Sequence, residues 1–230
     1  MTEPPLHVIS SMATRELMSE LARDYASATS REVATDAAGG VDVAKRVERG
    51  DGLEVVVLAS SAIDKLIAER KVLAGSRVDL VRSGVAVAVR AGAPRPDIAT
   101  EEALRRAVLR AKTLSYSTGP SGTHLEKTFE RWGILAELRP RIVVPPPGVP
   151  VGSLVASGTA EIGFQQLSEL ANLPGVEVVG PLPAPIQTLT IFSGGIAATC
   201  RRPDAARALL EFMASPAAAD AKKRHGLEPA

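Results

Sequence analysis

LEVVVLASSAIDKLIAERKVL, residues 53–73, holds two patterns one after the other. Residues 53–61 form a nearly continuous run of aliphatic residues, many of them β-branched, which is typical of a strand buried on both faces of a parallel sheet. Residues 62–73 place apolar side chains at helical spacing, so an amphipathic helix is predicted to follow. A buried strand that leads directly into a helix is the repeating unit of α/β domains.

The residues before this segment repeat the same order. Strands are predicted at 6–10 and 31–40, and helices at 13–29 and 41–50. In the first of these helices, Leu17, Leu21 and Tyr25 recur on one face, as expected for a helix packed on a sheet. Residues 6–73 therefore predict the start of a doubly wound α/β domain.

The rest of the chain predicts a second lobe of the same kind. Further strands are expected at 84–94 up to a Pro-rich turn, at 113–117, at the start of 141–150 before a rigid loop, at the start of 160–170, and at 176–183 and 186–200. Further helices are expected at 100–112, 123–134, 151–158, 203–215 and 216–226. The predicted fold class is α/β, with two doubly wound lobes joined by two crossing strands near 84–90 and 187–199. Lobe I would comprise residues 1–83 and 192–230, and lobe II residues 84–191.

Composition excludes several classes of function. Apolar residues make up 45% of the 230 residues, which is typical of a globular protein. The formal net charge is only +1 and aromatic residues are 3%, so neither a strong positive field nor a base-stacking surface is available for nucleic acid. The phosphate-binding patterns GxxxxGK[ST] and GxGxxG are absent, and the three histidines have no metal-ligand spacing. We expect no metal and no cofactor.

The chain has a single cysteine, Cys200, so an internal disulfide is excluded and a cysteine-based zinc site is not expected. Cys200 is predicted to be an ordinary buried or half-buried residue at a strand end. No apolar run approaches about 18 residues, so we expect no membrane insertion. The start MTEPPLHVIS does not resemble a signal peptide, which predicts a cytoplasmic protein; a trimmed mature form would instead be periplasmic.

Uncharged hydrogen-bond donors and glycines gather where the predicted strands end and helices begin. In open α/β sheets, ligands bind beyond the carboxyl ends of strands, and helix N-termini favour anions. Such residues are also ordinary turn and cap residues, and only their recurrence at five strand ends favours a ligand. The predicted ligand-binding residues are Ser10, Ser11, Gly39, Gly40, Ser60, Ser115, Ser117, Thr118, Ser121, Gln165 and Gln166.

The segment SYSTGPSGTH, residues 115–124, is the richest of these ends. Its hydroxyl groups stand at a predicted helix start, and Gly119 and Gly122 would let the backbone approach an anion closely. His124, in the first turn of that helix, could face either the ligand or the solvent. The segment therefore predicts one wall of an anion-binding site.

Several segments together resemble the periplasmic-binding-protein type II fold, the two-lobed "Venus flytrap", and its molybdate-binding-protein-like group. The resemblance covers nearly the whole chain and is carried by LHVISSMATRELMSELA, AGGVDVAKRVERGDGLEVVVLAS, SGVAVAVRAG, SLVASGTAEIGF and FMASPAAADAKKRHG. It implies an anion held in the cleft between the lobes by hydroxyl groups and backbone N–H groups.

The residues at the matching positions depart from the molybdate pattern. The first-loop serine of that group falls at Ala13, beside Ser10 and Ser11, the second-loop serine near Gly39 and Gly40, and the last-loop tyrosine near Gln166. Glutamine amides suit a carboxylate better than a compact tetrahedral oxyanion. The segments SYSTGPSG, GFQQLSEL and IQTLTIFSGGI instead resemble a sub-branch related to aconitate isomerase.

Two functions follow from this resemblance. The first is a cofactor-free isomerase that moves an allylic proton of a small polycarboxylate, with His124 and Tyr116 as candidate catalytic residues, since no carboxylate is evident at the strand ends. The second is a solute-binding protein that delivers an oxyanion or carboxylate to an ABC permease, which requires export of the chain. Either function has a small anion as its ligand.

Overall fold

The segment 53–73 forms β3 (Val55–Ala59) and α3 (Ser60–Ala68) in the computed structural model, which describes residues 3–146 and 148–230. The chain divides into two units. Unit 1 comprises Met1–Arg82 and Ile191–Ala230, and unit 2 comprises Ser83–Thr190; the boundaries expected from the sequence were after residues 83 and 191. The chain passes from one unit to the other twice, within β4 (Val78–Arg90) and within β8 (Leu189–Ile196).

The sheet of unit 1 is built around three parallel strands. β1 (Leu6–Ser11) lies between β2 (Val33–Ala38) and β3, with Ser10 opposite Ala37 on one side and Val57 on the other. β8 pairs with β3 in the antiparallel direction, and β4 follows it in the strand order. The short C-terminal strand β9 (Glu228–Pro229) pairs with β4 at Val81 and Arg82.

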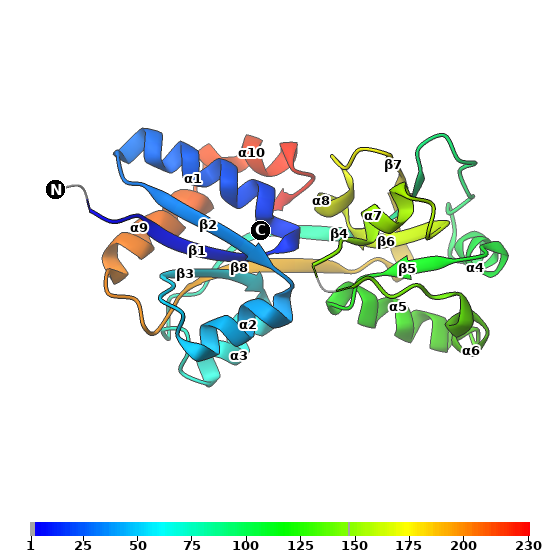
Figure 1. Cartoon of the computed structure of the whole chain (residues 1–230), viewed down its shortest axis with the longest axis horizontal. Coiled ribbons are helices and arrows are strands. Elements are labelled where there is room, and N and C mark those ends of the chain that lie inside the picture. Colours follow the sequence, from blue (N-terminus) through cyan, green and yellow to red (C-terminus); the bar gives the residue numbers. More distant parts are fainter. Residues whose placement is uncertain (1–2, 147) are drawn as a thin grey trace. The chain divides into compact units, whose positions relative to one another are not determined.

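Helices cover both faces of this sheet. Figure 1 shows α1 (Arg15–Thr29) on one face, and α2 (Gly40–Arg49) and α3 on the other. Val55 and Val57 pack in the core under α1 and α9 (Pro203–Ala214), while Val56 and Leu58 pack in the core under α2 and α3. Alternate residues of β3 therefore serve two cores, which explains why the whole strand is apolar.

Unit 2 repeats the arrangement on a smaller sheet. β6 (Ile162–Gln166) pairs with β5 (Leu114–Tyr116) in parallel and with β4 in the antiparallel direction, and β7 (Val176–Pro181) pairs with β4. In Figure 1, α5 (Pro120–Arg131) and α6 (Leu135–Leu138) lie below β5 and β6, and α7 (Val151–Ala156) and α8 (Leu167–Leu170) lie above them. The remaining elements are α4 (Glu101–Arg110), α10 (Ala219–Arg224) and the 3-10 turns Met12–Thr14, Arg139–Arg141, Ala184–Ile186 and Pro216–Ala218.

The predicted α/β class and two-lobe construction are confirmed, and one predicted element is wrong. The strand expected at the start of 141–150 does not form, and Ile142 makes only a single bridge to Leu114. Pro145 and Pro146 follow, and prolines have no N–H to donate to a ladder. Thr100 caps the start of α4, since its hydroxyl oxygen accepts a hydrogen bond from the Ala103 N–H at 3.1 Å.

Two predicted boundaries are corrected for physical reasons. The helix expected to reach residue 73 ends at Ala68, because Arg70 has a φ of 57° and the Leu73 N–H donates to the Ile196 carbonyl. The strand expected over 186–200 spans only Leu189–Ile196, because the Gln187 side chain bonds the backbone of Val85 in place of a strand partner.

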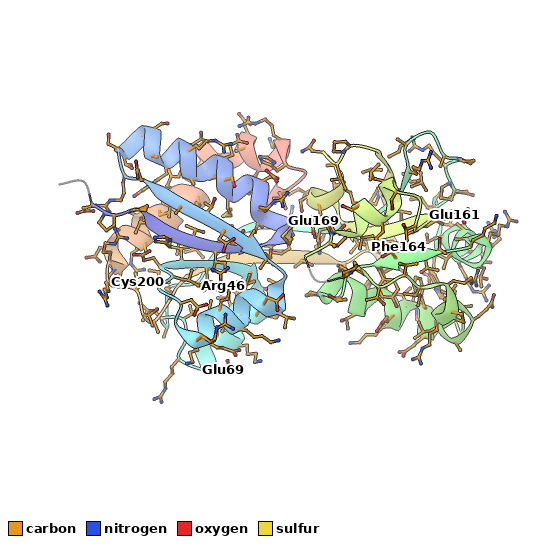
Figure 2. All side chains as sticks on the ribbon, in the orientation of Figure 1. Arg46, Glu69, Glu161, Phe164, Glu169 and Cys200 are labelled. Carbon is orange, nitrogen blue, oxygen red and sulfur yellow. The ribbon has the colours of Figure 1, made fainter. Side chains whose placement is uncertain are left out.

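Cys200, labelled in Figure 2, stands in the turn after β8 and not at the strand end. It is half-buried against the core of unit 1, as predicted, and burial raises the pKa of its thiol. Among the described residues, no helix has the length and apolarity needed to cross a membrane.

Candidate functional site

The predicted ligand-binding residues of unit 1 lie at one edge of its sheet. Because β2, β1 and β3 are parallel neighbours, their carboxyl ends meet, and these ends carry Ser10, Ser11, Gly39, Gly40 and Ser60. Gly39 is the N-cap of α2, and Ser60 is the first residue of α3. Neither helix has a side-chain cap, so the N–H groups of their first turns remain available to a ligand.

The two serines of β1 are already used within the turn that follows the strand. The Ser10 hydroxyl donates to the Ser11 carbonyl at 3.2 Å, and the Ser11 hydroxyl lies 3.4 Å from that of Thr14. Both serines are buried. They therefore shape the start of α1, and either hydroxyl would have to exchange a local hydrogen bond in order to hold an anion.

Gly39 and Gly40 are not required by the packing of unit 1. A Cβ built on Gly39 would have its nearest neighbour, Asp42 Oδ2, at 3.6 Å, and one on Gly40 would have Leu58 Cδ2 at 3.8 Å. Both are ordinary contact distances, and neither residue has a positive φ. Space left in front of the N-terminus of α2 is consistent with a ligand that approaches the backbone there.

In unit 2 the predicted residues lie at the adjacent carboxyl ends of β5 and β6. Tyr116, the last residue of β5, is opposite Phe164, labelled on β6 in Figure 2, and β6 continues to Gln165 and Gln166. Ser117 and Thr118 follow β5 directly. The structure thus brings the unit 2 donors together at a single sheet edge.

The loop after β5 is tied to the first turn of α5. The hydroxyl groups of Ser117 and Ser121 are 2.7 Å apart, which fixes the half-buried Ser117 against the buried Ser121. Packing within unit 2 requires glycine at position 122, because a Cβ there would overlap the Ser117 carbonyl oxygen. The expectation that Gly122 opens the backbone to an anion is therefore corrected: it lets α5 close on its own loop. Gly119 has no such contact.

Tyr116 and His124, the candidate catalytic residues, both have partners. The Tyr116 hydroxyl donates to Glu126 Oε1 at 2.9 Å. Burial, together with this hydrogen bond, raises the pKa of Tyr116 well above its usual value, so the phenol is a donor and not a base. His124 Nε2 lies 2.8 Å from the Ile186 carbonyl oxygen, a distance at which it donates, so that nitrogen is occupied.

Two glutamines and one serine complete the edge of the unit 2 sheet. Gln165 accepts from the Gly152 N–H at 3.1 Å and donates to Glu169, labelled on α8 in Figure 2, at 2.6 Å. Gln166 donates to the Thr190 hydroxyl at 2.9 Å. Gln166 Oε1 and the fully buried Ser115 Oγ have no hydrogen-bond partner among the described residues, which is rare for buried polar atoms.

Three charged residues near this edge were missed by sequence reasoning. Glu126 bonds Tyr116 and Glu169 bonds Gln165, so the expectation of no carboxylate at the strand ends is wrong. Glu126 and Arg139 also line a pocket of about 390 Å³ that includes Ser117 and Thr118. Glu126 lies two residues beyond SYSTGPSGTH, and its position within the predicted helix could have shown which face of the helix it occupies. Arg139 had none, because the turn that carries it was not predicted.

The described residues contain no group of three or more histidine, cysteine, aspartate or glutamate side chains that could hold a metal ion. The strand-end arrangement instead offers hydroxyl groups, amides and backbone N–H groups of two helix starts. Such donors suit a small anion.

The fold defined by these elements is the periplasmic-binding-protein type II fold. The periplasmic molybdate-binding protein of Azotobacter vinelandii aligns with a TM-score of 0.80 at 21% identity, over 96% of this chain and 98% of that one. A tungstate-binding protein from Desulfovibrio alaskensis aligns with a TM-score of 0.66 at 17% identity, over 95% and 93% of the two chains.

Residues 6–228 match the family described as bacterial extracellular solute-binding proteins, and the chain belongs to that family. The chain is also 38% identical over 232 residues to an aconitate isomerase of a Pseudomonas species, covering 97% of this chain and 87% of that protein. The resemblances inferred from the sequence segments are confirmed at the level of fold and family.

Proposed function

We propose that this protein binds a small organic polycarboxylate and interconverts cis- and trans-aconitate by moving an allylic proton. The observation that carries the proposal is the 38% identity to an aconitate isomerase along almost the entire chain. The overall reaction moves one proton and changes no oxidation state, so it needs neither a redox cofactor nor a second substrate.

The chemistry of the strand ends supports a carboxylate ligand. Ser117, Thr118 and the start of α5 offer hydroxyl and N–H donors, and Gln166, the last residue of β6, offers an amide. The buried Ser115 Oγ has no partner among the described residues and can donate to a carboxylate, whereas the unpartnered Gln166 Oε1 can only accept, for instance from a water.

The experiment that tests the proposal is proton NMR of cis-aconitate incubated with the purified protein in deuterium oxide. We expect trans-aconitate to appear above a control without protein, and deuterium in the product would show exchange of the migrating proton with solvent. If the ratio of cis- to trans-aconitate does not differ from that of the control after many hours at micromolar protein, the isomerase proposal is wrong.

A second candidate function is supported by the family itself. Bacterial extracellular solute-binding proteins form the family that matches residues 6–228, so delivery of an anion to an ABC permease is the alternative. Calorimetric titration with molybdate and with tricarboxylates separates the two: tight molybdate binding without isomerisation would favour the transport role. Cytoplasmic location stays a prediction, which fractionation of cells that express the natural gene would test.

A further inference from the structure

The pocket beside the unit 2 strand ends has the size and lining of a small-molecule site. Its volume of about 390 Å³ falls within the range of about 300–1,000 Å³ that is usual for such sites. It is lined by the end of β5, by α5 and by residues 135–144. Its polar lining consists of Tyr116, Ser117, Thr118, Thr123, Glu126 and Arg139.

Arg139 supplies the only positive charge in the described lining of this pocket. The residue is exposed and forms no ion pair within the described part of the chain, not even with Glu126, which lines the same pocket. A guanidinium group binds carboxylates through two parallel hydrogen bonds, which makes arginine a selective partner for a planar anion. Arg139 is therefore free to bind a carboxylate that enters the pocket.

Glu126 supplies the only carboxylate in the same described lining. The Tyr116 hydroxyl donates to one of its oxygens, Oε1, at 2.9 Å, and the other oxygen has no hydrogen-bond partner within residues 3–146 and 148–230. Because the Tyr116 ring is buried against Phe129, with ring centroids 6.1 Å apart, the phenol is a fixed donor. One oxygen of Glu126 is thus positioned, and the other is available to a substrate.

We infer that this pocket is the proton-transfer site of the proposed isomerase, with Glu126 as the catalytic base, Arg139 as the residue that binds a substrate carboxylate, and Tyr116 as the residue that positions Glu126. The inference rests on the proposed function and supplies the base that the strand-end serines lack. Ser117 and Thr118 line the pocket and directly follow β5, so the pocket is continuous with the predicted anion-binding edge.

The proton transfer is balanced within the substrate. Glu126 takes one proton from the methylene carbon, the electron pair of that C–H bond forms the new C=C bond, and the pair of the old C=C bond moves into the adjacent carboxylate. The protonated Glu126 then returns a proton to the former vinyl carbon, which restores the carboxylate and leaves the double bond shifted by one position. Arg139 stabilises the negative charge that develops on the carboxylate between the two transfers.

The central experiment replaces Glu126 with glutamine and repeats the NMR assay in deuterium oxide. We expect isomerisation to fall by about 10²-fold or more, the range for loss of a general base, while calorimetric affinity for trans-aconitate stays within about threefold. Glu130→Gln is the matched control, because Glu130 is an exposed glutamate one turn further along α5 and does not line the pocket. It should leave both quantities unchanged.

Two further variants test the partners of Glu126. Arg139→Gln should weaken tricarboxylate binding by about 10- to 100-fold, as expected for a lost charge-assisted hydrogen bond, whereas Arg207→Gln on α9 should not. Tyr116→Phe should lower kcat by about tenfold with KM within about threefold, because it misplaces the base without removing a binding group. Thermal unfolding of each variant verifies that it is folded.

The outcomes separate this inference from the proposed function. If the wild-type protein isomerises aconitate and Glu126→Gln keeps more than about a third of that rate, the proposed function stands and Glu126 is not the base. If the wild-type protein does not isomerise aconitate at all, the proposed function and the base assignment both fail. In that case, a loss of tricarboxylate affinity in Arg139→Gln would still support the pocket as a carboxylate site.

Discussion

Gly122 is fixed by its neighbours, because a side chain there would collide with the Ser117 carbonyl oxygen. We predict that Gly122→Ala lowers the free energy of unfolding by about 3 kcal/mol, at the upper end of typical overpacking costs. Gly119→Ala, three residues earlier, should cost less than about 0.5 kcal/mol, since its nearest neighbour would be Ser117 Oγ at 3.9 Å. Urea denaturation of both variants measures the difference, and equal costs would contradict the packing argument.

Gly40 presents the opposite case, since unit 1 has room for a side chain there. Gly40→Ala should stabilise α2 by up to about 1 kcal/mol, the helix propensity gained over glycine. It should weaken tricarboxylate binding about tenfold, or about 1.4 kcal/mol, by moving the ligand away from the helix N-terminus. Calorimetry and thermal unfolding provide the two readouts. Ala44→Gly in the same helix is the control, which should lower stability and leave the affinity for tricarboxylates unchanged. If Gly40→Ala also leaves that affinity unchanged, Gly40 is not part of the binding site.

The pairing of β4 with β8 in unit 1 is reinforced by a side-chain hydrogen bond. The Ser193 hydroxyl donates to Asp79 Oδ1 at 2.6 Å, and this bond, followed by Arg77, lowers the pKa of Asp79. A carboxyl whose folded pKa lies below its unfolded value of about 3.9 contributes stability above that pH, and the contribution is lost as pH falls through the folded pKa.

We therefore predict that Ser193→Ala destabilises the protein at neutral pH by about 1 kcal/mol, a value reduced for the partial exposure of Asp79. The difference from wild type should shrink as the pH falls below about 4. Urea denaturation at neutral pH and at about pH 3 tests this. A difference that is the same at both pH values would show that the hydroxyl acts by packing alone.

The start of α9 is held to β1 and to the residue before β3 by a partly buried ion pair. Glu54 Oε1 accepts from Arg202 Nη2 at 2.5 Å, and Glu54 Oε2 accepts from the His7 N–H at 2.7 Å. Arg202→Ala would leave the 8%-exposed Glu54 without its cation, so we expect a loss of about 3–5 kcal/mol in unfolding free energy. Arg207→Ala, on the exposed side of α9, is the control and should cost less than about 0.5 kcal/mol. A cost for Arg202→Ala no larger than that of the control would show that the pair adds nothing.

Elements whose apolar residues follow a clear pattern along the chain could be predicted from the sequence, whereas features set by contacts distant in the sequence could not. β3 was predictable because alternate residues, such as Val56 and Val57, enter different cores. The end of α3 at Ala68 was not, because it depends on Leu73 bonding Ile196, far away in the sequence. The short strand expected at the start of 141–150 does not form, because only Ile142 pairs with Leu114 before the prolines begin.

The same division holds for the candidate site. Donors such as Ser117 and Gln166 could be predicted, because polar residues after an apolar run mark the end of a strand in the sequence. Glu126 was harder to place, because a charged residue within a helix is usually a solvated one. Glu126 reaches Tyr116 only because Gly122 lets the first turn of α5 pack closely on the preceding loop. The direction in which the helix leaves that loop decides whether two residues ten apart come into contact, and the sequence does not specify this direction.

For the molecule as a whole, ligand binding should appear as added stability. A ligand that binds only the folded state stabilises it by about 2.7 kcal/mol at a concentration of 100 times Kd. We expect cis-aconitate to raise the Tm by an amount that grows with the logarithm of its concentration, whereas acetate at equal ionic strength does not. Differential scanning fluorimetry measures both, and an equal response to the two salts would indicate a nonspecific ionic effect.

Unit 2 is a single continuous insertion, whereas unit 1 is assembled from both ends of the chain. β3 therefore leaves the ribosome long before β8, the strand that covers its edge. At about 5–20 residues per second, synthesis of the roughly 130 residues between Ala59 and Leu189 takes on the order of 6–26 s. During that interval unit 2 can finish folding while the nascent β1–β3 sheet exposes an apolar edge. We expect the growing chain to need chaperone protection at that stage, and translation speed between Ser83 and Thr190 to influence its yield.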